Sequence, residues 1–136
     1  MNRQHRRNGD EGHASVFLIL LMPVVIIVFA LVWEAGQMLA AKSELLATAH
    51  EAARAGTHQI DERRTLERGA PVMDPGRARR AAARYLHDTG ATGTVQAREG
   101  QVAVVARTTY TPALLPIGPR VIEARATASA LQPPPG

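Results

Sequence analysis

The chain has 136 residues, which is enough for one small domain and not for two. It contains no cysteine, which excludes disulfides, thiol catalysis and a cysteine-ligated zinc site. The net charge is +4, but the 13 Lys/Arg and 10 Asp/Glu from Glu34 onward are interspersed along the sequence. Such mixing is typical of a solvated surface, and it argues against a nucleic-acid-binding protein.

An apolar segment follows a short basic tail. Residues 1–13 contain three arginines, and residues 14–33 are 20 consecutive residues without a charge. A helix of about 20 apolar residues crosses the hydrocarbon core of a bilayer and satisfies its own backbone hydrogen bonds. We therefore expect a transmembrane helix from Ala14 to Trp33, with Trp33 at the headgroup level. Because Lys and Arg stay on the cytoplasmic side, the tail is expected in the cytoplasm and the rest of the chain outside it.

Two other interpretations of this segment are less favoured. A cleaved secretory signal has an apolar run of about 7–15 residues, which is shorter than this one. A buried core helix would need a larger domain to cover it than the remaining sequence can form. Pro23 lies inside the apolar run and predicts a kink, because proline removes one helical hydrogen bond.

Residues 34–56 are expected to continue the same helix beyond the membrane. They contain no proline and are rich in Ala, Leu and Glu, which favour helices. Apolar residues at three- and four-residue spacing form a stripe, and Gly56 follows as the expected C-cap. The stripe is a candidate interaction face for a partner helix, or it packs on the chain's own domain; its principal residues are Met38, Leu45 and Ala49.

After a polar loop at 57–73, which has a helical turn between Asp61 and Glu67, residues 74–131 are expected to form a small extracytoplasmic domain. Asp74 and Pro75 predict the start of a helix that ends at Gly90. One face of this helix is arginine-rich, and it is either a solvated face or a site for a phosphate or an acidic polymer. The arginines are Arg77, Arg80 and Arg84.

Beyond Gly93 the sequence changes to an alternating pattern, which predicts strands. We expect strands at 94–98, 101–111 and 120–130, the first two joined by a hairpin turn at Glu99 and Gly100. The fold class is therefore α+β, with a long N-terminal helix, a second short helix and a three-stranded antiparallel sheet. The proline-rich tail at 132–136 cannot extend the sheet.

The connection between the second and third strands is apolar and bounded by prolines. Leu114, Leu115 and Ile117 are its large side chains. They either tuck under the sheet or form an exposed docking patch for the membrane or for another subunit.

Motifs of catalytic and metal sites are absent from the sequence. The five histidines show no metal-ligand spacing with a neighbouring carboxylate, and neither a G-x-S-x-G elbow nor a phosphate-binding glycine loop occurs. We therefore expect no enzyme activity, no metal and no cofactor.

The N-terminal half resembles the TadE/TadG-like family of Tad (Flp-type) pilus-assembly proteins. The resemblance rests on Gly12 before the span, on Met22 and Pro23 within it, and on the Ala-Ala-Arg-Ala-Gly stretch at 52–56. In processed members a prepilin peptidase cleaves after the glycine, and a glutamate stands at the fifth position after it. Gly12 and His13 match the cleavage site, whereas Phe17 occupies the fifth position. This departure makes the chain more similar to TadG-like members, which keep the span as an anchor.

The resemblance implies a minor pilin-like or pilus-assembly structural subunit of a Tad pilus or a related secretion system. Its expected partners are the membrane, other pilus or pseudopilin subunits through the N-terminal helix, and a prepilin peptidase. The alternative function is a membrane-anchored extracytoplasmic protein that binds a ligand or the cell wall through the arginine-rich face or the apolar connection.

Overall fold

The computed structural model describes residues 10–98 and 100–130. Its elements in chain order are α1 (Asp10–Thr57), α2 (Glu62–Arg68), α3 (Pro75–Asp88), β1 (Thr92–Arg98), β2 (Gln101–Tyr110) and β3 (Arg120–Ser129). The predicted α+β class is confirmed: a long N-terminal helix and two short helices accompany a three-stranded antiparallel sheet. The three arginines of the basic tail, the proline-rich tail and Glu99 lie outside the described residues.

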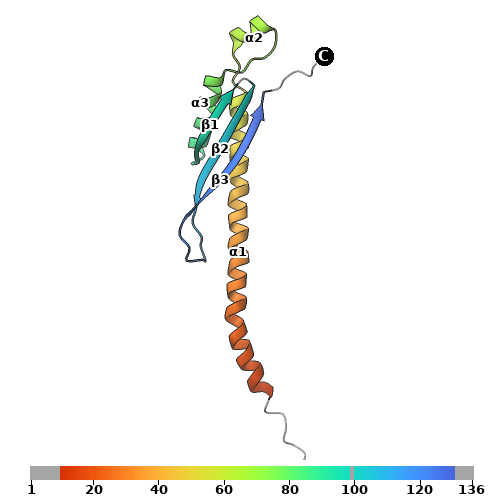
Figure 1. Cartoon of the computed structure of the whole chain (residues 1–136), viewed down its shortest axis with the longest axis vertical. Helices are drawn as coiled ribbons and strands as arrows, with labels where there is room; N and C mark the ends of the chain where they lie inside the picture. The colour runs from red at the N-terminus through yellow and green to blue at the C-terminus, as the bar shows by residue number, and fades with distance from the viewer. Residues whose placement is uncertain (1–9, 99, 131–136) are drawn as a thin grey trace, which may run out of the picture.

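Helix α1 is continuous over 48 residues, which corresponds to about 72 Å at 1.5 Å per residue. It begins before the expected start at Ala14 and runs on through Pro23. The sheet and α3 lie along its C-terminal half only, and the N-terminal half extends beyond the domain (Figure 1).

Gly56 does not cap α1 as the sequence indicated. The helix continues to Thr57, and Gly56 is buried in its last turn. A Cβ at this position would lie 3.0 Å from the carbonyl oxygen of Ala78 and 3.1 Å from the methyl groups of Val102. The glycine therefore allows α3 and β2 to approach the end of α1 closely. In the sequence alone, a glycine needed for such packing cannot be distinguished from a glycine that caps a helix.

The sheet has the order β1-β2-β3, with antiparallel pairing throughout. Alternate residues of β2 and β3 point toward α1 and α3, and these residues form the core together with the small side chains of both helices. Alanine is frequent among them, which lets the two helices and the sheet pack closely around few large side chains. The buried residues of the core are Leu45, Ala49, Ala52, Ala53, Met73, Ala78, Ala82, Leu86, Val102, Val104, Ala106, Ile122, Ala124 and Ala126.

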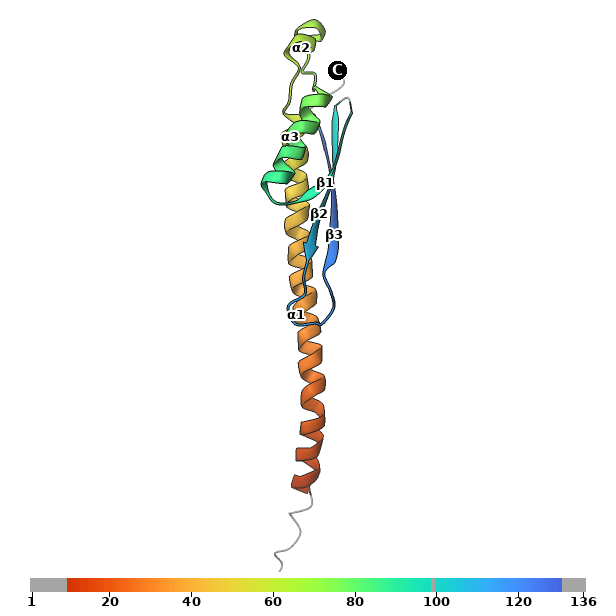
Figure 2. The same cartoon turned by 90° about the vertical axis from the view of Figure 1, so that its left-hand side faces the viewer.

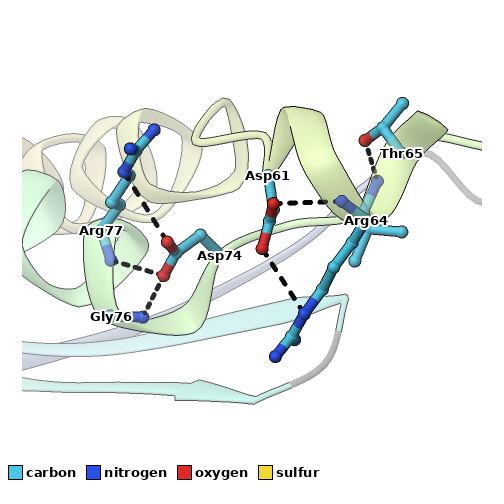
Figure 3. Close-up of polar contacts among 7 residues, drawn as sticks. Asp61, Arg64, Thr65, Asp74, Gly76 and Arg77 are labelled. Atoms are coloured by element: carbon cyan, nitrogen blue, oxygen red, sulfur yellow. Dashed lines mark hydrogen bonds and ion pairs between the residues drawn. The ribbon is translucent and has the colours of Figure 1, made fainter. Parts of the chain in front are cut away.

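Helix α2 lies in the connection between α1 and α3, and backbone hydrogen bonds from Asp61 to Val72 and from Asp74 to Gln59 join the two ends of this connection. Asp61 caps its N-terminus by accepting a hydrogen bond from the amide of Arg64, and Gly69 ends it in the left-handed conformation at φ 66°. The amide of Val72 donates to the hydroxyl of Thr65 at 3.1 Å, which ties the returning chain to the helix (Figure 3). The turn expected between Asp61 and Glu67 is thus a short helix, at the end of the domain farthest from the N-terminal half of α1 (Figures 1 and 2).

Helix α3 starts as its sequence predicts. The carboxylate of Asp74 accepts hydrogen bonds from the amides of Gly76 and Arg77 at 2.8 and 3.0 Å, and Pro75 occupies the first turn (Figure 3). These contacts, the backbone amide of Arg77 foremost, lower the pKa of Asp74. The cap fixes the start of the helix and thereby the face that it turns to the core.

Candidate functional site

The N-terminal half of α1 is an exposed apolar surface. The large side chains from Val16 to Trp33 are all between 39% and 70% exposed, and residues 14–33 carry no charge. Phe29 and Trp33 stack at the C-terminal end of this run, with ring centroids 6.4 Å apart. Within the described residues, α1 is the one helix whose length and composition would allow it to cross a membrane.

A hydrogen-bonded cluster lies directly at the end of the apolar run. Glu34 is 5% exposed, and its carboxylate accepts a hydrogen bond from the hydroxyl of Tyr110 at 2.5 Å. The same carboxylate accepts the amide of Ala113 at 3.2 Å and the amide of Leu114 at 3.1 Å. We call these four residues the Glu34 clasp, because they join α1 to the end of β2 and to the segment that follows it.

The electrostatics of the clasp agree with its geometry. The hydrogen bond from Tyr110 is the main cause that lowers the pKa of Glu34; the amides of Leu114 and Ala113 act in the same direction, and partial desolvation opposes them. The bond to Glu34 correspondingly raises the pKa of Tyr110. The hydrogen bond therefore favours the ionised carboxylate of Glu34 together with the neutral phenol of Tyr110. Hydrogen bonds to an ionised acceptor are stronger than those between neutral groups.

The clasp holds residues 111–119, which we call the apolar loop, beside α1. Leu114 is 53% exposed and Ile117 is 42% exposed, whereas Leu115 is half-buried. The side chains of this segment thus differ: Leu115 is half-buried, whereas Leu114 and Ile117 are exposed.

The candidate cleavage site lies in the first turn of α1. Gly12 is exposed, and a Cβ there would meet no atom within 4 Å. His13 follows in the same turn, and Phe17 is 65% exposed on the next. No specific interaction of Gly12 or Phe17 distinguishes this part of the described chain from the rest of the apolar run.

The candidate interaction stripe of α1 is divided between two environments. Leu45 is 4% exposed and Ala49 is fully buried, and both belong to the core of the chain's own domain. Met38, about two turns closer to the apolar run than Leu45, is 41% exposed. Of these three residues, Met38 remains on the surface for another molecule.

The arginine-rich face of α3 borders an open hollow of about 350 Å³. Arg77 also forms an ion pair with Asp74 at 3.7 Å. Ala55 of α1 and Gln59, which follows that helix, complete the lining. The lining consists of Ala55, Gln59, Arg77, Arg80, Ala81, Arg84, Tyr85 and Asp88. In the described parts of the chain, no group of three or more His, Asp or Glu side chains could hold a metal ion.

The pairing of Glu34 with Tyr110 was not predictable from sequence patterns. Glu34 was visible only as the first charge after the apolar run, and Tyr110 as a residue of the strand expected at 101–111. A carboxylate directly after 20 uncharged residues is a usable signal, since such a group needs either water or specific donors. Its donors are 76 to 80 residues away, and local patterns do not reveal them.

The comparisons with known proteins agree with the resemblance of the N-terminal half. Searches of curated proteins and of solved structures returned no match. The family described as Flp pilus-assembly TadE/G-like matches residues 12–84, which is more than half of the chain. The match includes nearly all of α1, all of α2 and most of α3. The chain belongs to this TadE/G-like family of Flp pilus-assembly proteins.

Proposed function

We propose that the chain is a minor pilin-like structural subunit in the assembly of a Tad (Flp-type) pilus or a related secretion system. The observation that carries the proposal is that α1 has two different halves, in a chain that belongs to a family of pilus-assembly proteins. Its N-terminal half exposes a continuous apolar surface, and its C-terminal half contributes Leu45, Ala49, Ala52 and Ala53 to a folded domain. Such a helix can anchor a domain and also pack beside other subunits.

In this proposal residues 14–33 cross the membrane and residues 34–56 project from it. The arginines of the N-terminal tail favour a cytoplasmic N-terminus, so the small domain at 74–131 is extracytoplasmic. We assign the protein no catalytic role and no cofactor. Phe17 stands where processed pseudopilins have glutamate, which favours a chain that keeps its anchor and is not cut between Gly12 and His13.

Other subunits would contact the exposed surface of α1. Within the membrane this surface is the apolar run. Outside it the exposed large apolar side chains of α1 are Met38, Leu39 and Leu46, at 41%, 69% and 40%. Leu45 and Ala49 cannot serve a partner without opening the core. The proposed contact with pilus subunits therefore uses the exposed side chains of α1 and not the buried face that contains Leu45 and Ala49.

Deletion of the gene followed by complementation tests the proposal. We expect pili to be lost or reduced in number, and to return with the wild-type chain. Photo-crosslinkers at Met38 and Leu39 should then capture another single-span or pilus subunit, whereas one at Leu66, which is 85% exposed on α2, should not. Unchanged pilus numbers after deletion would reject the assembly role.

The hollow beside α3 supports a second candidate function, binding of an acidic ligand or cell-wall polymer. Three arginines line it, and the side chain of Asp88 offsets one of their charges. The triple substitution Arg77→Gln, Arg80→Gln and Arg84→Gln should abolish such binding in a co-sedimentation assay with wall polymer. The matched control is Arg63→Gln with Arg68→Gln on α2; equal loss in both variants would indicate non-specific attraction to positive charge.

A further inference from the structure

The apolar loop lies at the end of the sheet that is closest to the N-terminal half of α1. Both views place the connection between β2 and β3 beside this helix, opposite the end that carries α2 (Figures 1 and 2). The Glu34 clasp fixes its position, because the amides of Ala113 and Leu114 bind the first residue after the uncharged run. The hydrogen bonds to Glu34 thus fix the position of the loop along the axis of α1.

We propose that the apolar loop inserts Leu114 and Ile117 into the interfacial region of the same bilayer that residues 14–33 cross. This inference rests on the membrane anchoring in the proposed function. The occupant to which we commit is lipid at the boundary between headgroups and acyl chains, and the loop is a second attachment of the domain beside its transmembrane helix.

The composition of the loop fits an apolar environment. Its nine residues carry no charge, and the two large aliphatic side chains that face outward lie on one short segment. Leu115 is half-buried, whereas Leu114 and Ile117 are 53% and 42% exposed. Leu114 and Ile117 lie outside the core of the domain, and both are exposed large hydrophobic side chains.

The backbone of the loop has few amides that would need water. Pro112, Pro116 and Pro119 have no N–H group, and the amides of Ala113 and Leu114 are bound to the carboxylate of Glu34. Five of the nine residues thus present no free donor. An unsatisfied donor is expensive in an apolar environment, so this arrangement lowers the penalty for bringing the loop into the interface.

The residues that flank the loop match the polarity gradient of a membrane surface. Trp33, one residue before the clasp, is of the type that prefers the headgroup level. Arg120, which is exposed and pairs with Tyr110 in the sheet register, follows the loop directly and can meet lipid phosphates. A second protein subunit is the other conceivable occupant of Leu114 and Ile117. The uncharged loop and its flanking Trp33 and Arg120 match a lipid interface, and they favour lipid.

Insertion at two points restrains the orientation of the domain. A single helix leaves a domain free to tilt with the helix and to rotate about its axis. A loop held in the interface on one side of α1 removes much of this freedom, so the sheet and α3 face a fixed direction relative to the membrane. Other subunits would then bind the domain in this fixed orientation.

The absence of native cysteine allows a direct test with single-cysteine variants of the full chain. Leu114→Cys and Ile117→Cys would carry a nitroxide label in vesicles of phosphatidylethanolamine and phosphatidylglycerol. Collisions with oxygen, which concentrates in lipid, and with a water-soluble nickel chelate report the depth of each label. The reference positions are Leu66→Cys on α2 for water and Val28→Cys in the apolar run for the hydrocarbon core.

We expect the labels at 114 and 117 to show more oxygen and fewer nickel collisions than the label at 66, with depths short of that at 28. Ile117→Ser should shift the label at 114 toward water, whereas the control Val121→Ser, at a side chain 69% exposed on β3, should not. If the labels at 114 and 117 collide with the nickel chelate as often as the label at 66, while the label at 28 collides mainly with oxygen, the proposed insertion of the loop is wrong and the transmembrane helix is supported. Frequent nickel collisions of the label at 28 would instead reject the membrane anchor of the proposed function. Shielding that disappears when the lipid-to-protein ratio is raised would identify another copy as the occupant and would also overturn the proposal.

Discussion

Leu45 and Leu46 provide a matched pair that tests whether the outer half of α1 belongs to the core of the domain. They are neighbours on one helix and have the same side chain, but Leu45 is 4% exposed and Leu46 is 40% exposed. Leu45 lies in the same core as Val102 and Ile122 of the sheet. We predict that Leu45→Ala destabilises the domain and that Leu46→Ala does not.

The magnitude follows from the atoms that are removed. Truncation of Leu45 deletes three buried carbon groups, or about 2.4 kcal/mol of transfer free energy at about 0.8 kcal/mol each. The cavity left behind adds to this, and buried Leu→Ala substitutions cost about 2–5 kcal/mol in total. For Leu46 we expect a change within about 0.5 kcal/mol, as for other surface positions. Small domains have a total stability of only about 5–15 kcal/mol, so the loss at Leu45 is a large fraction.

Hydrogen exchange of the full chain in detergent micelles measures this difference. The amides of β2 are protected by the sheet, and they should exchange from roughly 30-fold to roughly 4,000-fold faster in Leu45→Ala, since about 1.4 kcal/mol corresponds to a factor of ten. Those in Leu46→Ala should match the wild type. Equal effects of the two substitutions, or none from either, would refute the packing of the Leu45 face against the sheet and would reopen this stripe as a surface for partners.

Three further predictions concern single positions. Gly93→Ala should destabilise the domain by about 1–3 kcal/mol in thermal unfolding, because its Cβ would lie 2.1 Å from the carbonyl oxygen of Val105; Gly36→Ala, which meets nothing within 4 Å, is the control, and equal melting of the two variants would contradict this account. The pKa of Glu34 is lowered by the hydrogen bond from Tyr110, so the stability from the clasp is present above the ordinary value of 4.5 and is lost as the pH falls below it. Exchange of the Ala113 and Leu114 amides, corrected for intrinsic rates, should accelerate in that range, and Glu34→Gln should remove this dependence while the acid sensitivity due to Asp74 and Glu123 remains. Mass spectrometry of the membrane-extracted chain should find the N-terminus at Met1 or Asn2, and a mass that begins at His13 would show pilin-type processing instead.

Sequence periodicity was sufficient for most of the secondary structure. The uncharged run, the alanine-rich extension and the alternating strands each have a local pattern, and the structure has a helix or a strand at each place. The N-cap of α3 was also readable, because the carboxylate of Asp74 accepts hydrogen bonds from amides within three residues and Pro75 suits the first helical turn. These features depend on neighbours in the chain, which is the information that a single sequence contains.

Features that depend on distant segments were not predictable in the same way. Gly56 has the local context of a helix C-cap, and only the approach of Ala78 and Val102 shows its other role. Which part of the α1 stripe is covered depends on where the sheet docks along the helix. The Glu34 clasp likewise requires the position of Tyr110 relative to α1, and no periodicity encodes it.

The most direct test of the account is the sidedness of the chain in the membrane. Because the chain has no native cysteine, Asn8→Cys and Leu66→Cys can each be labelled with a membrane-impermeant maleimide in spheroplasts. We predict that the cysteine at position 66 reacts in intact spheroplasts, and that the one at position 8 reacts only after the membrane is permeabilised. Reaction of both before permeabilisation, or of position 8 alone, would contradict a single span with the folded domain outside.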